Sequence, residues 1–146
     1  MNKNETKKND EAYILNLCDE VLGESSFRQH TFNFLRGDPG KNGVGRKLPV
    51  DSFYPSLKLV IEYKERQHTE PAPFFDKQHK ITVSGVHRGE QRKLYDQRRR
   101  EILPKNKIQL LELSYSDFFH NNNKRLTRNR EDDLRILRGK LATWIK

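Results

Sequence analysis

The chain has 146 residues, enough for one domain with a modest hydrophobic core and too few for two independent domains. Lysine and arginine outnumber aspartate and glutamate by 29 to 20, and this net charge of +9 favours polyanionic partners, nucleic acid first, over the simpler alternative of surplus lysine for solubility. A single cysteine, Cys18, excludes intramolecular disulfides and cysteine-rich zinc sites, and no stretch of about 20 apolar residues predicts a membrane span, so we expect a cytoplasmic protein that does not contact membranes.

The N-terminal region predicts a short tail followed by a helix. Residues 1–9 are polar and lysine-rich, which predicts a disordered basic lead-in without the apolar centre of a signal peptide, and residues 10–146 then form a single domain. A helix is predicted over residues 10–22, with Asp10 as its N-cap and Gly23 at its end. Its apolar face consists of Ile14, Leu15, Cys18, Val21 and Leu22.

The next segments predict a second helix, a loop and a β-hairpin. Residues 25–35 predict a short helix, whereas residues 36–47 contain four glycines and no apolar periodicity and therefore predict a long loop. Residues 48–54 and 57–64 predict two strands, and the Pro55-Ser56 spacing between them suits a tight antiparallel connection.

The C-terminal half predicts a crossover, two helices and one more strand. Residues 69–89 show no clear period and are expected to cross the sheet, and a charged helix over residues 90–103 is stopped by Pro104. Residues 108–113 predict a third buried strand, and an amphipathic helix runs from about residue 130 to the C-terminus. This order predicts an α/β fold of three layers, α/β/α, with a mixed sheet and an additional C-terminal helix.

Three charged residues are the candidates for chemistry. Because side chains alternate along a strand, Glu62 and Lys64 share one face at the end of an otherwise apolar strand, opposite the face that carries Leu59, Ile61 and Tyr63. Asp51 precedes Glu62 by eleven positions, so the hairpin can bring both carboxylates together.

Phosphodiester hydrolysis needs a hard cation on oxygen ligands, an activated water and stabilisation of phosphate charge. Asp51 and Glu62 would bind Mg²⁺, and Lys64 would orient or help to deprotonate the water and offset charge. The alternative is that Glu62 and Lys64 form an ordinary ion pair at a strand end.

The string Leu48-Pro49-Val50-Asp51 is followed, after eight residues, by Val60-Ile61-Glu62-Tyr63-Lys64, so that ten residues separate Asp51 from Glu62. This pattern resembles the active-site signature of the PD-(D/E)XK nuclease superfamily, with Val50 where many members have proline. The resemblance implies a restriction-endonuclease-like core, a single nuclease-like domain over residues 10–146, and DNA cleavage with Mg²⁺, for which Mn²⁺ is expected to substitute.

A narrower similarity is to the very-short-patch-repair-like branch of that superfamily and covers about residues 48–114. There, a histidine follows the strand glutamate by six residues, and His68 is that histidine here. The chain departs from the branch by carrying Lys64 where a second aspartate is usual. His68 is thus either a general base or an exposed histidine at a strand end.

Residues on the predicted helices extend the candidate site. Gln91 and Tyr95 lie on one helix face and resemble the Gln-xxx-Tyr element of RecB-like and exonuclease members of the superfamily, where it lines the active site; a structural role in bonding the crossover is the alternative. Many members also use an acidic residue of the first helix as an accessory metal ligand. Helical geometry favours Asp19 for this role, the superfamily pattern favours Glu20, and Glu24 is a third candidate.

Arg46, Lys47 and Arg98 are the candidate DNA contacts. The sequence therefore predicts a metal-dependent DNA endonuclease, and the alternative is a catalytically inactive nucleic-acid-binding module on the same fold. The apolar face of the C-terminal helix has two alternative roles. It could cover the chain's own core, or it could form the interface of a homodimer.

Overall fold

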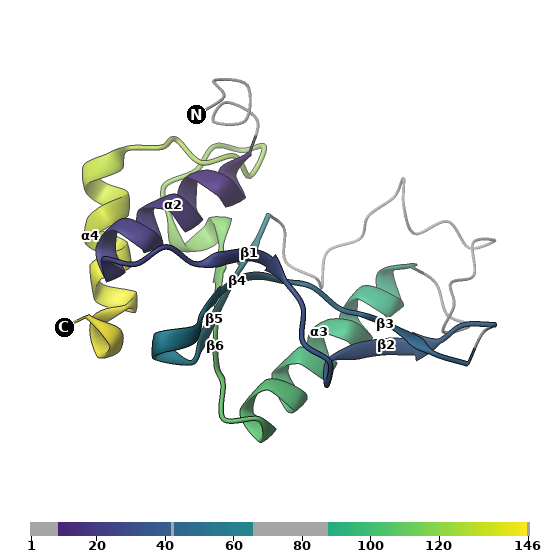
Figure 1. The fold of residues 1–146 in the computed structure, drawn as a ribbon. Coiled ribbons are helices and arrows are strands. Elements are labelled where there is room, and N and C mark those ends of the chain that lie inside the picture. Colours follow the sequence, from purple (N-terminus) through teal and green to yellow (C-terminus); the bar gives the residue numbers. More distant parts are fainter. Residues whose placement is uncertain (1–8, 42, 66–87, 146) are drawn as a thin grey trace.

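The computed structural model describes residues 9–41, 43–65 and 88–145. The chain is a mixed α/β protein built on a four-stranded sheet with the strand order β1-β4-β5-β6 (Figure 1). These strands are β1 (Phe27–His30), β4 (Val50–Tyr54), β5 (Leu59–Lys64) and β6 (Gln109–Ser114). The helices are α2 (Asp10–Leu22), α3 (Arg88–Lys105) and α4 (Arg130–Lys140), and β2 (Arg36–Pro39) and β3 (Gly45–Lys47) form a separate two-stranded sheet.

The four-stranded sheet is mixed, as the sequence predicts. β4 and β5 form an antiparallel pair in which Ser52 faces Ile61 and Tyr54 faces Leu59, and a short 3₁₀ turn, Pro55–Leu57, connects them. β1 pairs antiparallel with β4, and β6 pairs parallel with β5 after the chain has passed through α3. β5 is therefore a central strand, and its side chains are enclosed from both faces.

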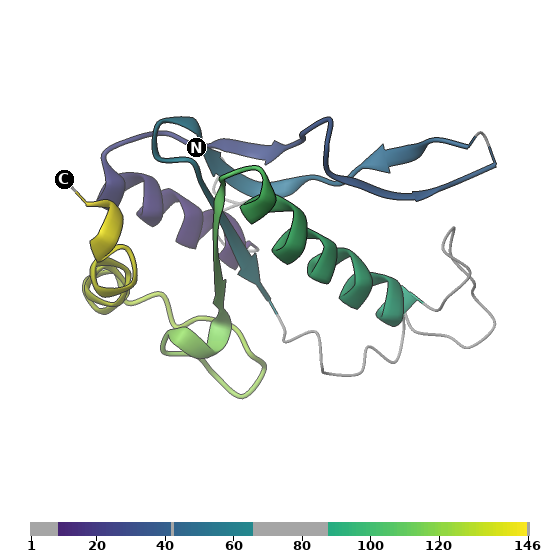
Figure 2. The ribbon, with the colours of Figure 1, turned by 90° about the horizontal axis from the view of Figure 1, so that it is seen from below.

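Helices cover both faces of the sheet. In Figure 2, α2 and α4 lie together on one side and α3 lies on the other. The first side holds the larger apolar cluster, in which Leu59 and Ile61 pack with residues of α2 and α4 such as Ile14 and Leu137. A smaller cluster on the α3 side joins Val60 to Leu35, Leu48, Val50, Leu103 and Ile108. The alternation predicted for β5 is thus present.

Two predicted elements between residues 25 and 47 were wrong. The segment predicted as a second helix contains β1, whose Phe27 and His30 pair with Phe53 and Val50 of β4. Only one pair of its apolar residues, Phe32 and Leu35, has helical spacing, so pairing with an existing strand outweighs a weak helical tendency. The segment predicted as a loop is the β2–β3 hairpin, which runs away from the four-stranded sheet at the right of Figure 1.

Several boundaries also differ from the prediction. Asn9, and not Asp10, is the N-cap of α2, because its side-chain Oδ1 accepts a hydrogen bond from the Ala12 N–H group. Pro104 lies inside α3, in its last turn, and the final helix ends at Lys140 before a 3₁₀ turn.

Residues 1–8, 66–87 and 146 lie outside the described part of the chain, and with them nearly all of the predicted lead-in and crossover. No described helix is long and apolar enough to cross a membrane.

Candidate active site

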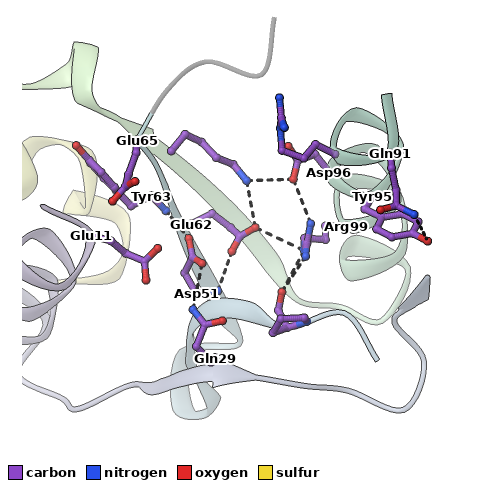
Figure 3. Close-up of a pocket in the computed structure, with 13 residues that line it drawn as sticks. Glu11, Gln29, Asp51, Glu62, Tyr63, Glu65, Gln91, Tyr95, Asp96 and Arg99 are labelled. Atoms are coloured by element: carbon purple, nitrogen blue, oxygen red, sulfur yellow. Dashed lines mark hydrogen bonds and ion pairs between the residues drawn. The ribbon is translucent and has the colours of Figure 1, made fainter. Parts of the chain in front are cut away.

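A cavity of about 620 Å³ opens where β4 and β5 begin to separate beneath α3. It is lined from the sheet by Asp51, Glu62 and Lys64, and from α3 by Asp96 and Arg99 (Figure 3). The three residues singled out on the strands therefore face one space, as the alternation of β4 and β5 predicts.

Asp51 and Glu62 hold the two strands together at the point where backbone pairing stops. The β4–β5 ladder ends with the pair Ser52 and Ile61. Beyond it, the Asp51 N–H group donates to Glu62 Oε2 at 2.7 Å, and the Tyr63 N–H group donates to Asp51 Oδ2 at 2.8 Å. Each carboxylate thus uses one oxygen to satisfy the neighbouring backbone and turns the other toward the cavity.

Two cations bridge the strand carboxylate to a second carboxylate on α3. Lys64 Nζ lies 3.4 Å from Glu62 Oε1 and 3.1 Å from Asp96 Oδ1. Arg99 contacts the same two oxygens at 3.6 and 3.1 Å and also donates to the Pro49 carbonyl. The side chains of Glu62 and Asp96 are only 4% exposed, so this network fixes Lys64 over the cavity in a place with little water.

Negative charge accumulates on the opposite side of the cavity. Burial, reinforced by the charges of Glu62 and Glu11, raises the pKa of Asp51 from 3.8 to about 7. The pKa of Glu11 is also raised, first by burial and then by Glu65 and Glu62. Asp51, Glu62 and Glu11 thus place negative charge around a half-buried space, which favours the approach of a cation.

Glu11 is a site residue that the sequence reasoning missed. It lies in the first turn of α2, and Figure 3 shows it pointing toward Asp51 from the side opposite α3. The only signal in the sequence was an acidic residue eight positions before Asp19 and nine before Glu20, just over two turns earlier on the helix. Choosing between these turns requires the angle at which α2 crosses the sheet.

The first-helix acids named from the sequence have other partners and do not line the cavity. Asp19 forms an ion pair with Arg28 at 3.0 Å and accepts a hydrogen bond from the Tyr54 hydroxyl group. Glu20 forms an exposed ion pair with Arg130, and Glu24 accepts a hydrogen bond from Ser56. Of the acids on α2, Glu11 is the one that lines the cavity, in place of Asp19 and Glu20.

The remaining predicted residues fall into two groups. Gln91 and Tyr95 line the cavity and are joined by a hydrogen bond of 3.3 Å from Gln91 Nε2 to the Tyr95 hydroxyl oxygen. That hydroxyl also accepts the Asp38 N–H group of the β2–β3 hairpin. Arg98 bonds to the hairpin as well, whereas Arg46 and Lys47 are exposed on it. His68 lies outside the described residues.

The donor set fits Mg²⁺ held by few protein ligands. Asp51 and Glu62 offer carboxylate oxygens side by side, and the pKa of Asp51 is raised by burial and by neighbouring carboxylates, both of which a bound cation would offset. In the described part of the chain, no three His, Cys, Asp or Glu residues converge closely enough to hold an ion alone. Mg²⁺ commonly takes one or two carboxylates and keeps several waters, so two ligands are sufficient.

The arrangement can bind a divalent cation, present an ammonium group to a phosphate and hold both in a restricted volume. Searches against models of protein families, curated proteins and solved structures found no match to the chain.

Proposed function

We propose that the chain is a Mg²⁺-dependent deoxyribonuclease on a restriction-endonuclease-like core. The observation that carries this proposal is the convergence of Asp51 and Glu62, from two paired strands, with Lys64 at one cavity. Phosphoryl transfer uses all three groups, the two carboxylates for the metal ion and the lysine for the charge on the phosphate. A mixed sheet with helices on both faces is compatible with such a core.

Each residue has a defined task in this proposal. Hydrolysis forms a bond from a water oxygen to phosphorus, breaks the bond from phosphorus to one ester oxygen, and delivers a proton to that oxygen. Asp51 and Glu62 would hold Mg²⁺, which would polarise the phosphate and lower the pKa of a nearby water. Lys64 would donate to a non-bridging phosphate oxygen and orient the water. Asp96 and Arg99 keep the Lys64 ammonium in position.

A second candidate function is nucleic-acid binding without cleavage. One observation favours it: Glu62 Oε1 already has two cationic partners, Lys64 and Arg99, which compete with a metal ion for that oxygen. The net charge of +9 would serve a binding module equally well.

The test is incubation of the purified chain with plasmid, single-stranded and branched DNA in Mg²⁺ or Mn²⁺. Glu62→Gln and Lys64→Gln are compared with wild type, and each is expected to reduce cleavage by at least about 100-fold. The matched control is Glu112→Gln, because Glu112 stands beside Glu62 in the parallel β5–β6 register and pairs with Arg100 instead of lining the cavity.

The outcomes separate the two functions. Loss of cleavage in Glu62→Gln and Lys64→Gln, with Glu112→Gln active, supports the nuclease. Cleavage that survives both substitutions removes these residues from the site. DNA binding without metal-dependent cleavage of any DNA form supports the binding module.

A further inference from the structure

A second hollow lies next to the cavity and continues it. Its volume is about 600 Å³, and it runs between the β2–β3 hairpin and α3. Pro49, Gln91 and Tyr95 line both this hollow and the cavity that holds Asp51 and Glu62. The two spaces therefore meet, and together they form a groove that leads from the candidate active site along the hairpin.

The base of the hairpin is fixed to α3 by specific contacts. The Tyr95 hydroxyl accepts the Asp38 N–H group at 3.0 Å, and Arg98 bonds to the Asp38 carboxylate at 2.7 Å and to the Arg36 carbonyl at 3.1 Å. Gly37 lies against the Tyr95 ring, where an added Cβ would come within 2.8 Å of ring atoms. The hairpin is thus held in a defined position relative to the cavity.

The outer part of the hairpin carries cations that no internal contact uses. Lys41, Arg46 and Lys47 are exposed and line the second hollow, and their side chains have no ion-pair or hydrogen-bond partner within residues 9–41, 43–65 and 88–145. The single carboxylate of the hairpin, Asp38, is already paired with Arg98. The groove wall is therefore strongly positive, which suits a row of phosphates.

We propose that the β2–β3 hairpin is an arm that grips double-stranded DNA beside the scissile phosphate, with Lys41, Arg46 and Lys47 on the phosphate backbone. This inference rests on the proposed nuclease function and names its substrate class. A two-stranded ribbon projecting from the sheet, as Figure 1 shows, has the width that a duplex groove admits.

Single-stranded DNA fits this groove less well. Proteins that bind single strands stack the bases on aromatic side chains. Among the described residues that line the second hollow, Tyr95 is the sole aromatic one. Gly37 packs against its ring, and the Arg98 guanidinium lies over the ring at 5.2 Å from its centroid, so little of the ring is left for a base. Phosphate contacts, and not base stacking, are what the hairpin offers.

The experiment measures duplex and single-strand binding by the full chain in EDTA over a range of salt. The arm variant is Lys41→Gln/Arg46→Gln/Lys47→Gln. We expect its duplex affinity to fall by about 10- to 100-fold near physiological salt, and the slope of log affinity against log salt to flatten by roughly 2 to 3. Single-strand affinity should fall by a smaller factor, because single strands carry a lower charge density and release fewer counterions per phosphate contact.

The matched control is Lys58→Gln/Lys105→Gln/Lys107→Gln, which removes the same charge from exposed positions at the start of β5 and the end of α3, away from both hollows. Its salt slope should stay within one of wild type. Equal losses in the arm and control variants, or equal losses for duplex and single strand, would overturn the arm.

Failure of the arm and failure of the nuclease are distinguishable. An arm variant that binds duplex like wild type, alongside a Glu62→Gln variant that has lost cleavage, overturns the arm and leaves the nuclease. A wild type that never cleaves but loses duplex binding in the arm variant keeps the arm and overturns the nuclease. Where both hold, the arm variant should recover cleavage at protein concentrations that saturate the DNA.

Discussion

The face of the sheet that packs against α2 and α4 is apolar along the length of β5, whereas the face toward α3 is apolar only at one end. On the first face, Leu59, Ile61 and Tyr63 are at most 3% exposed. On the other, Val60 is followed by Glu62 and Lys64. One strand thus serves a hydrophobic core with one set of alternating side chains and a polar cavity with the other.

The polar contacts on the two faces also differ in kind. Between α2 and α4, each buried carboxylate meets a neutral or single cationic partner, as when the Tyr13 hydroxyl bonds to Asp133 at 2.6 Å. Around the cavity, several charges converge, and burial together with the charges of Glu62 and Glu11 raises the pKa of Asp51. We therefore expect the α2–α4 face to contribute most of the stability, and the charged cavity on the α3 face to lower it.

The strongest loss of stability is expected from a substitution on the apolar face. Leu137→Ala removes a fully buried side chain of α4, and we expect the free energy of unfolding to fall by about 3 kcal/mol in urea denaturation. Cleavage per folded molecule should not change. Leu103→Ala is the matched variant on the α3 face, and because α3 also positions Asp96 and Arg99, it should lose both stability and cleavage. Equal losses of activity in Leu137→Ala and Leu103→Ala would show that the α3 face is no more important for cleavage than the α2–α4 face.

The next effect tests Asp96 as a positioning residue. Asp96→Asn keeps the volume of the side chain but removes the charge that Lys64 and Arg99 share. We expect kcat to fall by about 30-fold, roughly 2 kcal/mol, with little change in KM. Glu101→Gln, an exposed carboxylate on the same helix that bonds to Gln97, is the control and should retain full activity. A change in KM alone would show that Asp96 serves DNA binding and not the placement of Lys64.

The centre of the site could be predicted from sequence because it depends on local periodicity. Two-residue alternation determines that Glu62 and Lys64 share a face, and a short connection between antiparallel strands places Asp51 opposite Glu62. Both relations hold whatever the rest of the fold is, and both are present in the structure.

The periphery could not be predicted because it depends on contacts between distant segments. Whether Glu11 or Asp19 reaches the cavity is decided by the path of α2 across the sheet. The β2–β3 hairpin has little alternation, since neither of its faces is fully buried, and its position depends on Tyr95, 57 residues after Asp38. β1 is short and its pairing with β4 is likewise non-local.

A smaller effect concerns stability against pH. Because the pKa of Asp51 is raised from 3.8 to about 7 in the folded state, the folded chain binds more protons than the unfolded chain between these values. The free energy of unfolding in EDTA should therefore fall as pH rises through this window. Asp51→Asn removes the effect and should stabilise the protein by about 1 to 2 kcal/mol at pH 8, a sign opposite to that of most substitutions.

Thermal unfolding between pH 4 and pH 8 measures this effect, with Asp132→Asn, whose carboxylate pairs with Arg135, as the control that keeps the wild-type slope. Mg²⁺ should raise the Tm of wild type more than that of Asp51→Asn, because only the carboxylate binds the cation well. A destabilised Asp51→Asn at pH 8 would show that the charge on Asp51 is not opposed by its neighbours.

The smallest effect comes from removing one hydroxyl on each face. Tyr13→Phe deletes the hydrogen bond to the buried Asp133, and Tyr95→Phe deletes the acceptor of the Asp38 N–H group. Each should cost about 1 kcal/mol of unfolding free energy, since each leaves one buried polar group without that partner. Duplex affinity separates them, because Tyr95→Phe loosens the arm and should weaken binding severalfold, whereas Tyr13→Phe should bind like wild type. If Tyr13→Phe weakened duplex binding as much as Tyr95→Phe at equal stability, the two faces would not divide stability from function.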